Sequence, residues 1–120
     1  MKIRIYGNSV RFRLSKSEVG KLEEEGYLEE TTDFGTAQLS YALQKSGGDE
    51  LKARFEDNKI TLDIPVKLLT GWAANNTVGF EGNMPLGNGG SLYMLIEKDF
   101  KCLDNVAEDQ SDNYDNPKTC

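Results

Sequence analysis

The chain opens with the fourteen residues Met1-Lys2-Ile3-Arg4-Ile5-Tyr6-Gly7-Asn8-Ser9-Val10-Arg11-Phe12-Arg13-Leu14, in which charged and apolar side chains alternate on both sides of a glycine-asparagine pair. A two-residue turn led by glycine suits the right-handed twist of paired strands, and it fixes the register of the two arms. The register pairs Ile5 with Val10 and Ile3 with Phe12 on one face, and Arg4 with Arg11 and Lys2 with Arg13 on the other. We therefore expect a β-hairpin whose apolar face starts a core.

The outer face of this hairpin is the main candidate site for binding an anion or a partner, and it consists of Lys2, Arg4, Arg11 and Arg13. Like charges directly opposite each other destabilise a strand pair, so this face needs an anionic neighbour. Acids of the chain itself could supply it, from Glu29, Glu30, Asp33 or the C-terminal tail. The functional alternative is an external phosphate, carboxylate or acidic partner segment.

The balance of charge limits the partners of the chain. Its 14 Lys and Arg residues against 20 Asp and Glu residues give a net charge of −6, and residues 99–120 contribute six acids against two bases. Excess acid argues against non-specific nucleic-acid binding, which depends on neutralising phosphates. No apolar run reaches membrane-spanning length, and the N-terminus alternates like a strand and unlike a secretory signal. We expect a cytoplasmic protein with reduced thiols that binds neither nucleic acid nor membrane.

The pattern changes to a helix after the hairpin. Ser15 and Glu18 have the spacing of a capping box, and Gly26 is a suitable left-handed stop, so a short helix is expected between them. Two strands should follow, at residues 27–33 and 39–43. The second of these segments also fits a helix capped by Thr36.

The apolar pattern then recurs after about fifty positions, with Val10 matching Ile60 and Leu14 matching Ile64. Asp57-Asn58 again predicts a two-residue turn. Pro65 stands where Ser15 stood and begins a second helix, which Asn75-Asn76 would end. Strands are expected at residues 77–80 and 92–97, joined by a glycine-rich connection at 82–90. Chance agreement between amphipathic patterns is the alternative to a duplication.

These elements predict one α+β domain over residues 1–120. Two pseudo-repeats of the order strand, strand, helix, strand, strand would cover about residues 1–48 and 51–98, followed by an irregular acidic tail at 99–120. Neither repeat can bury a sheet face alone. The simplest solution is one mostly antiparallel sheet or a partly open barrel, with the two short helices covering one face or the open ends.

Candidates for catalysis are few, because the chain has no histidine and only two cysteines. A structural zinc site usually takes four Cys or His ligands, so Asp99, Cys102 and Cys120 are weak metal candidates and no cofactor is expected. The glycine-rich connection precedes a strand, so it lacks the helix-terminus donors of a phosphate loop. The remaining enzyme hypothesis is a metal-dependent or thiol-based reaction around Glu97, Asp99, Cys102 and Cys120.

Two segments, KIRIYGNSVRFRL at residues 2–14 and EKDFKCL at residues 97–103, resemble a family of small uncharacterised bacterial proteins. The resemblance extends over essentially the whole chain and includes Glu108-Asp109 and Asn116-Pro117. It implies a bacterial cytoplasmic protein and carries no activity with it. The leading functional hypothesis is therefore a non-enzymatic domain that binds a partner or assembles with itself, whose hairpin cations engage an acidic segment such as the tail of a second copy.

Overall fold

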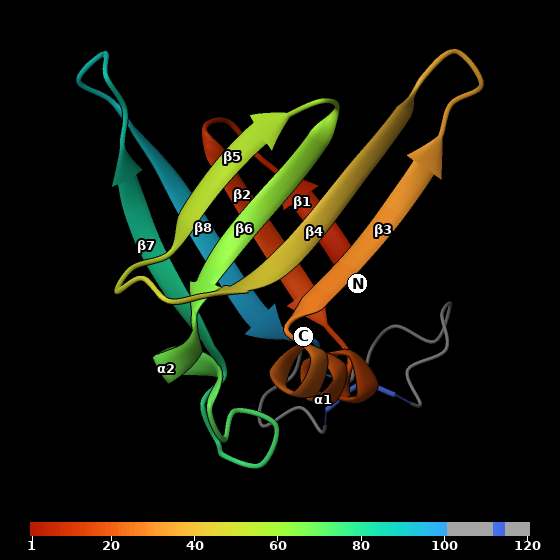
Figure 1. The fold of residues 1–120 in the computed structure, drawn as a ribbon, viewed down its shortest axis with the longest axis vertical. Helices are drawn as coiled ribbons and strands as arrows, with labels where there is room; N and C mark the ends of the chain where they lie inside the picture. Colours follow the sequence, from red (N-terminus) through yellow and green to blue (C-terminus); the bar gives the residue numbers. More distant parts are fainter. Residues whose placement is uncertain (101–111, 115–120) are drawn as a thin grey trace.

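The computed structural model describes residues 1–100 and 112–114, which form two four-stranded sheets and two helices (Figure 1). The elements follow the order β1 (Lys2–Ile5), β2 (Ser9–Leu14), α1 (Lys16–Glu25), β3 (Tyr27–Asp33), β4 (Gln38–Ser46), β5 (Lys52–Glu56), β6 (Lys59–Pro65), α2 (Val66–Leu69), β7 (Gly79–Pro85) and β8 (Ser91–Lys98). Both expected strands of the first half are present, and residues 38–46 form a strand and not a helix. The predictions for residues 101–111 and 115–120, which include Cys102 and Cys120, lie outside the described residues.

The two hairpins that begin the halves turn where predicted, and the first has the predicted register. Lys2 pairs with Arg13 and Ile5 with Val10, and the turn closes with a hydrogen bond from the Tyr6 N–H to the Ser9 carbonyl at 3.2 Å. Gly7 has a φ of 54°, as a glycine-led turn requires. The second hairpin turns at Asp57 and Asn58, both with positive φ.

The prediction of one mostly antiparallel sheet is wrong, because the described strands form two mixed sheets, which do not close into a barrel. The strand orders are β1-β2-β8-β7 and β3-β4-β6-β5, and in each sheet the central pair, β2 with β8 or β4 with β6, runs parallel. Each sheet therefore joins one hairpin from each half of the chain. An isolated two-stranded hairpin is only marginally stable, so in each layer a hairpin from one half pairs side by side with a hairpin from the other.

The helices close the same end of the two sheets, opposite the hairpin turns (Figure 1). Helix α1 begins at the predicted capping box, where the Ser15 N–H donates to Glu18 Oε1 at 2.9 Å, and it stops at Gly26 with a φ of 78°. Helix α2 is shorter than predicted, because the chain turns at Gly71, with a φ of 79°, and not at Asn75-Asn76. This turn lets the Trp72 ring enter the core.

The glycine-rich connection is also shorter than predicted. Residues 82–85 continue strand β7, and the turn to β8 occupies residues 86–90. Gly79, the first residue of β7, lies close to the neighbouring strand: a Cβ atom there would come within 2.2 Å of the Ile96 carbonyl oxygen. A glycine at this position therefore marks close strand packing.

One core fills the space between the sheets and extends to the helices. Its fully buried large side chains include Phe12 and Ile96 from the first sheet, Leu43 and Leu62 from the second, and Trp72. Ile5 departs from the expectation of a core position, because its side chain is 60% exposed at the open end of the sheets.

None of the helices within the described part of the chain has the length and apolar character needed to cross a membrane.

Candidate functional site

The four hairpin cations lie on the outer face of the first sheet, beside the acidic end of β8. Arg13 Nε lies 2.9 Å from Glu97 Oε1, and Arg11 Nε lies 3.8 Å from the same oxygen. Lys2 Nζ lies 3.0 Å from Asp99 Oδ2. These contacts exist because β8 pairs with β2 in a register that sets Arg13 beside Glu97.

Of the acids expected as internal counter-charges, Asp99 of the tail pairs with Lys2, whereas the three acids of β3 are engaged elsewhere. Glu29 pairs with Lys59 at 2.9 Å, Glu30 lies 3.7 Å from the N-terminal ammonium group, and Asp33 accepts a hydrogen bond from the Gly35 N–H at 2.8 Å. The counter-charge of Arg13 comes from Glu97, which the enzyme hypothesis assigns to a polar cluster. Local pattern could not reveal its position, because the contact depends on two strands that are far apart in the sequence.

Arg4 is the cation of this face with the least compensation. Its guanidinium carbon lies 5.9 Å from the centre of the Tyr6 ring, and among residues 1–100 and 112–114 it forms no ion pair. Arg11 shares the single Glu97 carboxylate with Arg13. The outer face of hairpin β1–β2 therefore keeps an excess of positive charge at its turn end.

A hollow of about 210 Å³ lies at this turn end. Its walls come from β1, β2 and β8 and consist of Arg4, Tyr6, Ser9, Val10, Arg11 and Tyr93. The Tyr93 hydroxyl donates to a Glu81 carboxylate oxygen, and this hydrogen bond raises the pKa of Tyr93. The hydroxyl is thus neutral at physiological pH. The charged side chains that line the hollow are the two arginines, with the Glu81 carboxylate next to Tyr93.

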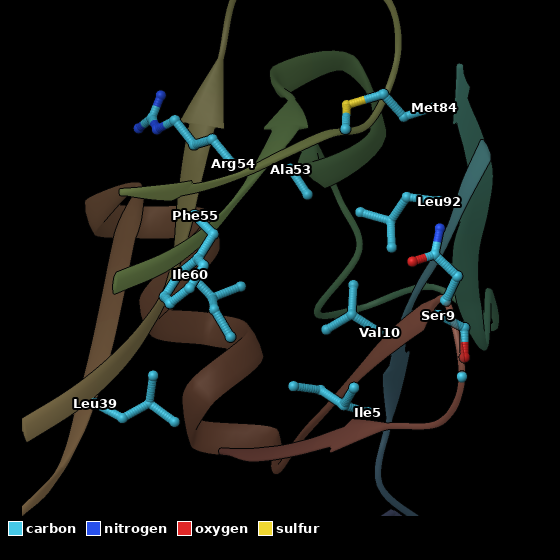
Figure 2. Close-up of a pocket in the computed structure, with 12 residues that line it drawn as sticks. Ile5, Ser9, Val10, Leu39, Ala53, Arg54, Phe55, Ile60, Met84 and Leu92 are labelled. Atoms are coloured by element: carbon cyan, nitrogen blue, oxygen red, sulfur yellow. The ribbon is translucent and has the colours of Figure 1, made fainter. Parts of the chain in front are cut away.

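A larger groove lies on the other side of the same turn, between the two sheets (Figure 2). It has a volume of about 440 Å³, and apolar side chains from both sheets face it: Ile5, Val10, Leu39, Ala53, Phe55, Ile60, Met84 and Leu92. The Phe55 side chain is 66% exposed at one edge of the groove, and the Ile5 side chain is 60% exposed at the opposite edge. This groove was not predicted from the sequence. Alternating apolar side chains mark a strand as part of the core, but they do not show where the two sheets diverge and leave a space.

The polar groups around the groove are already bonded to the protein. The Asn8 amide donates to the Ser91 carbonyl at 2.7 Å, and the Ser9 hydroxyl donates to the Tyr6 carbonyl at 2.6 Å. Arg54 directs its guanidinium away from the groove, toward Asp63 at 3.3 Å (Figure 2). The groove therefore offers apolar contact, and the charge for recognition comes from the neighbouring hollow.

The enzyme hypothesis placed Glu97 and Asp99 in a polar cluster with the two cysteines. Both carboxylates are partners of the hairpin cations, and the Asp99 backbone bonds to Leu14 on one side and Tyr114 on the other. Within the described residues, no three acidic or cysteine side chains gather as metal ligands. Cys102 and Cys120 lie outside those residues, so the cluster stays a prediction.

The model of a family of unknown function (DUF7009) matches residues 1–118 of the chain. No curated protein matches it. No solved structure matches it either.

Proposed function

We propose that this chain, which belongs to that family of unknown function, is a non-enzymatic binding module that takes an acidic polypeptide segment at the turn of hairpin β1–β2. Carboxylates of the segment would meet Arg4 and Arg11 in the hollow, and its apolar side chains would enter the adjoining groove. The observation that carries the proposal is that Arg4, which has no ion pair within the described residues, lies beside an apolar groove. The resemblance to a family without an assigned activity is confirmed by the family match.

The two features belong to one surface, since Ser9 and Val10 line both the hollow and the groove. Exposed apolar patches of this kind are typical of interaction sites on soluble proteins. The volume of the groove falls within the range of ligand pockets. The nearby cations would orient an acidic segment and speed its association with the protein. An occupant that is both acidic and apolar fits this surface better than a bare anion.

The C-terminal tail of a second copy is a segment of this chemistry. Its sequence includes Asp104, Glu108 and Asp109 on either side of Val106 and Ala107. We therefore propose that the protein can assemble with itself through this contact. The equivalent contact with another acidic protein would use the same residues.

The first test is binding of a fluorescent peptide with the sequence of residues 103–110, measured by anisotropy at low and at high salt. We expect saturable binding that weakens with salt, because exposed charge pairs are screened. The double variant Arg4→Gln/Arg11→Gln should weaken binding by about tenfold. In parallel, light scattering should show a larger particle at low salt than at high salt.

The matched control is the double variant Lys21→Gln/Lys67→Gln, which removes the same charge from helices α1 and α2. Both helices lie at the opposite end of the sheets, so this variant should bind the peptide like the wild type (Figure 1). An equal loss of peptide affinity in both double variants would mean that binding depends only on the net charge of the protein. A salt-insensitive monomer that does not bind the peptide would contradict the proposal.

We also infer that the two halves descend from one duplicated unit. Each half has the order of two strands, a helix and two strands, and exchanging the halves converts the strand order of one sheet into that of the other. Across the groove Ile5 corresponds to Phe55 and Val10 to Ile60. The groove would then lie on the pseudo-two-fold axis that relates the halves.

A further inference from the structure

Lys98, at the end of β8, is a buried lysine without an acidic partner among the described residues. Only 4% of its surface is exposed. Its ammonium donates one hydrogen bond, to the Asn75 carbonyl at 2.7 Å. The adjacent Asp99 points to the other face of the strand and pairs with Lys2, as the alternation of strand side chains requires.

Aromatic rings supply the other surroundings of this ammonium group. Its Nζ lies 5.7 Å from the centre of the Trp72 ring and 5.0 Å from that of Tyr114. Buried lysines are rare unless they are paired, because removing an ammonium group from water is costly. Burial accordingly lowers the pKa of Lys98, and no carboxylate of residues 1–100 or 112–114 counteracts this effect. Attraction to the rings offsets only part of this cost.

Lys98 lines a pocket of about 420 Å³ at the helical end of the molecule, away from the hairpin turns. A second cation, Lys16, stands on the same pocket, with its Nζ 5.8 Å from the centre of the Tyr114 ring. Asn76 adds an amide, and Val78 and Phe100 add apolar wall. The described lining thus contains two ammonium groups and no carboxylate.

We propose that this pocket binds a small organic carboxylate, with its carboxylate group on Lys98 and Lys16 and its apolar body against Val78 and Phe100. The two ammonium groups select a negative charge. The apolar wall and the volume select an organic acid over an inorganic anion, since ligand pockets of this size are lined mainly by apolar groups with few polar ones. The site is independent of the proposed peptide site, which lies at the opposite end of the sheets.

Benzoate is a suitable probe, with inorganic phosphate as the comparison anion. Trp72 is the only tryptophan and contacts Lys98, so its emission reports on the pocket. We expect a saturable change in Trp72 emission with benzoate, and amide chemical shifts that move at residues 75–78 and 98–100. Phosphate should bind at least about tenfold more weakly.

The variant Lys98→Met keeps the shape of the side chain and removes its charge, so we expect it to fold and to lose benzoate binding by about tenfold or more. Lys16→Gln should weaken binding to a smaller extent. The control is Lys67→Met on α2, whose ammonium is exposed and pairs with Asp49 at 3.3 Å; it should bind like the wild type.

Equal benzoate affinity in Lys98→Met and wild type would overturn the proposal. Equal affinity for phosphate and benzoate would overturn the choice of an organic acid. Absence of any saturable change in the wild type, together with an altered loop at residues 75–77 in Lys98→Met, would show that Lys98 only holds that loop.

Discussion

At the scale of single residues, the protein depends on a few positions where backbone segments approach closely. Gly79 is the tightest of them, since a Cβ atom there would lie 2.2 Å from the Ile96 carbonyl oxygen and 2.8 Å from Glu97 Cα. Backbone atoms cannot move aside like the end of a flexible side chain. Gly20, in the middle of α1, is different, because a Cβ atom there would meet nothing within 4 Å.

These two glycines make a matched pair of predictions. Gly79→Ala should lower the free energy of unfolding by about 1–3 kcal/mol, because β7 must shift against β8. Gly20→Ala should raise it by roughly 0.5–1 kcal/mol, because alanine favours a helix over glycine. Urea titration followed by circular dichroism measures both values. A neutral Gly79→Ala would mean that β7 and β8 lie farther apart than the structure has them.

At the scale of elements, helix α1 is held at its beginning by its own N-cap and by two distant segments of the chain. The Glu18 carboxylate accepts from the Ser15 N–H and pairs with the N-terminal ammonium group. Ser17 donates its hydroxyl to Asp112 Oδ2 at 2.6 Å. Burial by itself would raise the pKa of Glu18, but the hydrogen bonds with the N-terminal ammonium and with Ser15 outweigh it, so the pKa is lowered from 4.5.

This shift predicts a pH dependence of stability. A carboxyl group whose pKa is lowered by folding stabilises the folded state above its unfolded pKa, and this contribution is lost as the pH falls through the folded value. Glu18→Gln should therefore lower the free energy of unfolding by about 1 kcal/mol at pH 7 and by less below pH 4.5. The control, Glu24→Gln on the exposed side of α1, should change stability little at either pH. An equal loss for Glu18→Gln at pH 7 and pH 3 would contradict this origin.

At the scale of the whole molecule, the two sheets share one core and neither has a core of its own. Phe12 in the first sheet and Leu62 in the second are both fully buried in the same cluster. Each sheet also contains a hairpin from each half of the chain, so neither half can unfold without breaking both sheets. We therefore expect a single cooperative unfolding transition.

Truncation of core side chains in each sheet tests whether the two sheets unfold together. Phe12→Ala should lower the free energy of unfolding by about 3–5 kcal/mol and Leu62→Ala by about 2–5 kcal/mol. In both variants, the change in Trp72 emission and the loss of strand signal in circular dichroism should coincide along the urea axis. Separate midpoints for the two signals in either variant would show that the sheets are independent units.

Local signals account for the parts of the structure that were predicted correctly. The turns of both opening hairpins, the register of the first, the boundaries of α1 and the strand at residues 27–33 all follow from turn chemistry, capping and alternation. Each of these depends on residues close together in the chain. The early stop of α2 was missed because Asn75-Asn76 resembles a stop as much as Gly71 does, and burial of Trp72 decided between them.

Local sequence was enough to predict the two opening hairpins, the cationic face of hairpin β1–β2 and the capped helix, because these features depend on neighbours along the chain. The folded arrangement was needed to reveal the parallel pairing of β2 with β8 and of β4 with β6, the groove between the hairpin turns and the burial of Lys98 among aromatic rings. Those features join segments from opposite halves of the chain. Their energies come from burying a shared core, and no local pattern encodes which distant strand will cover a given apolar face.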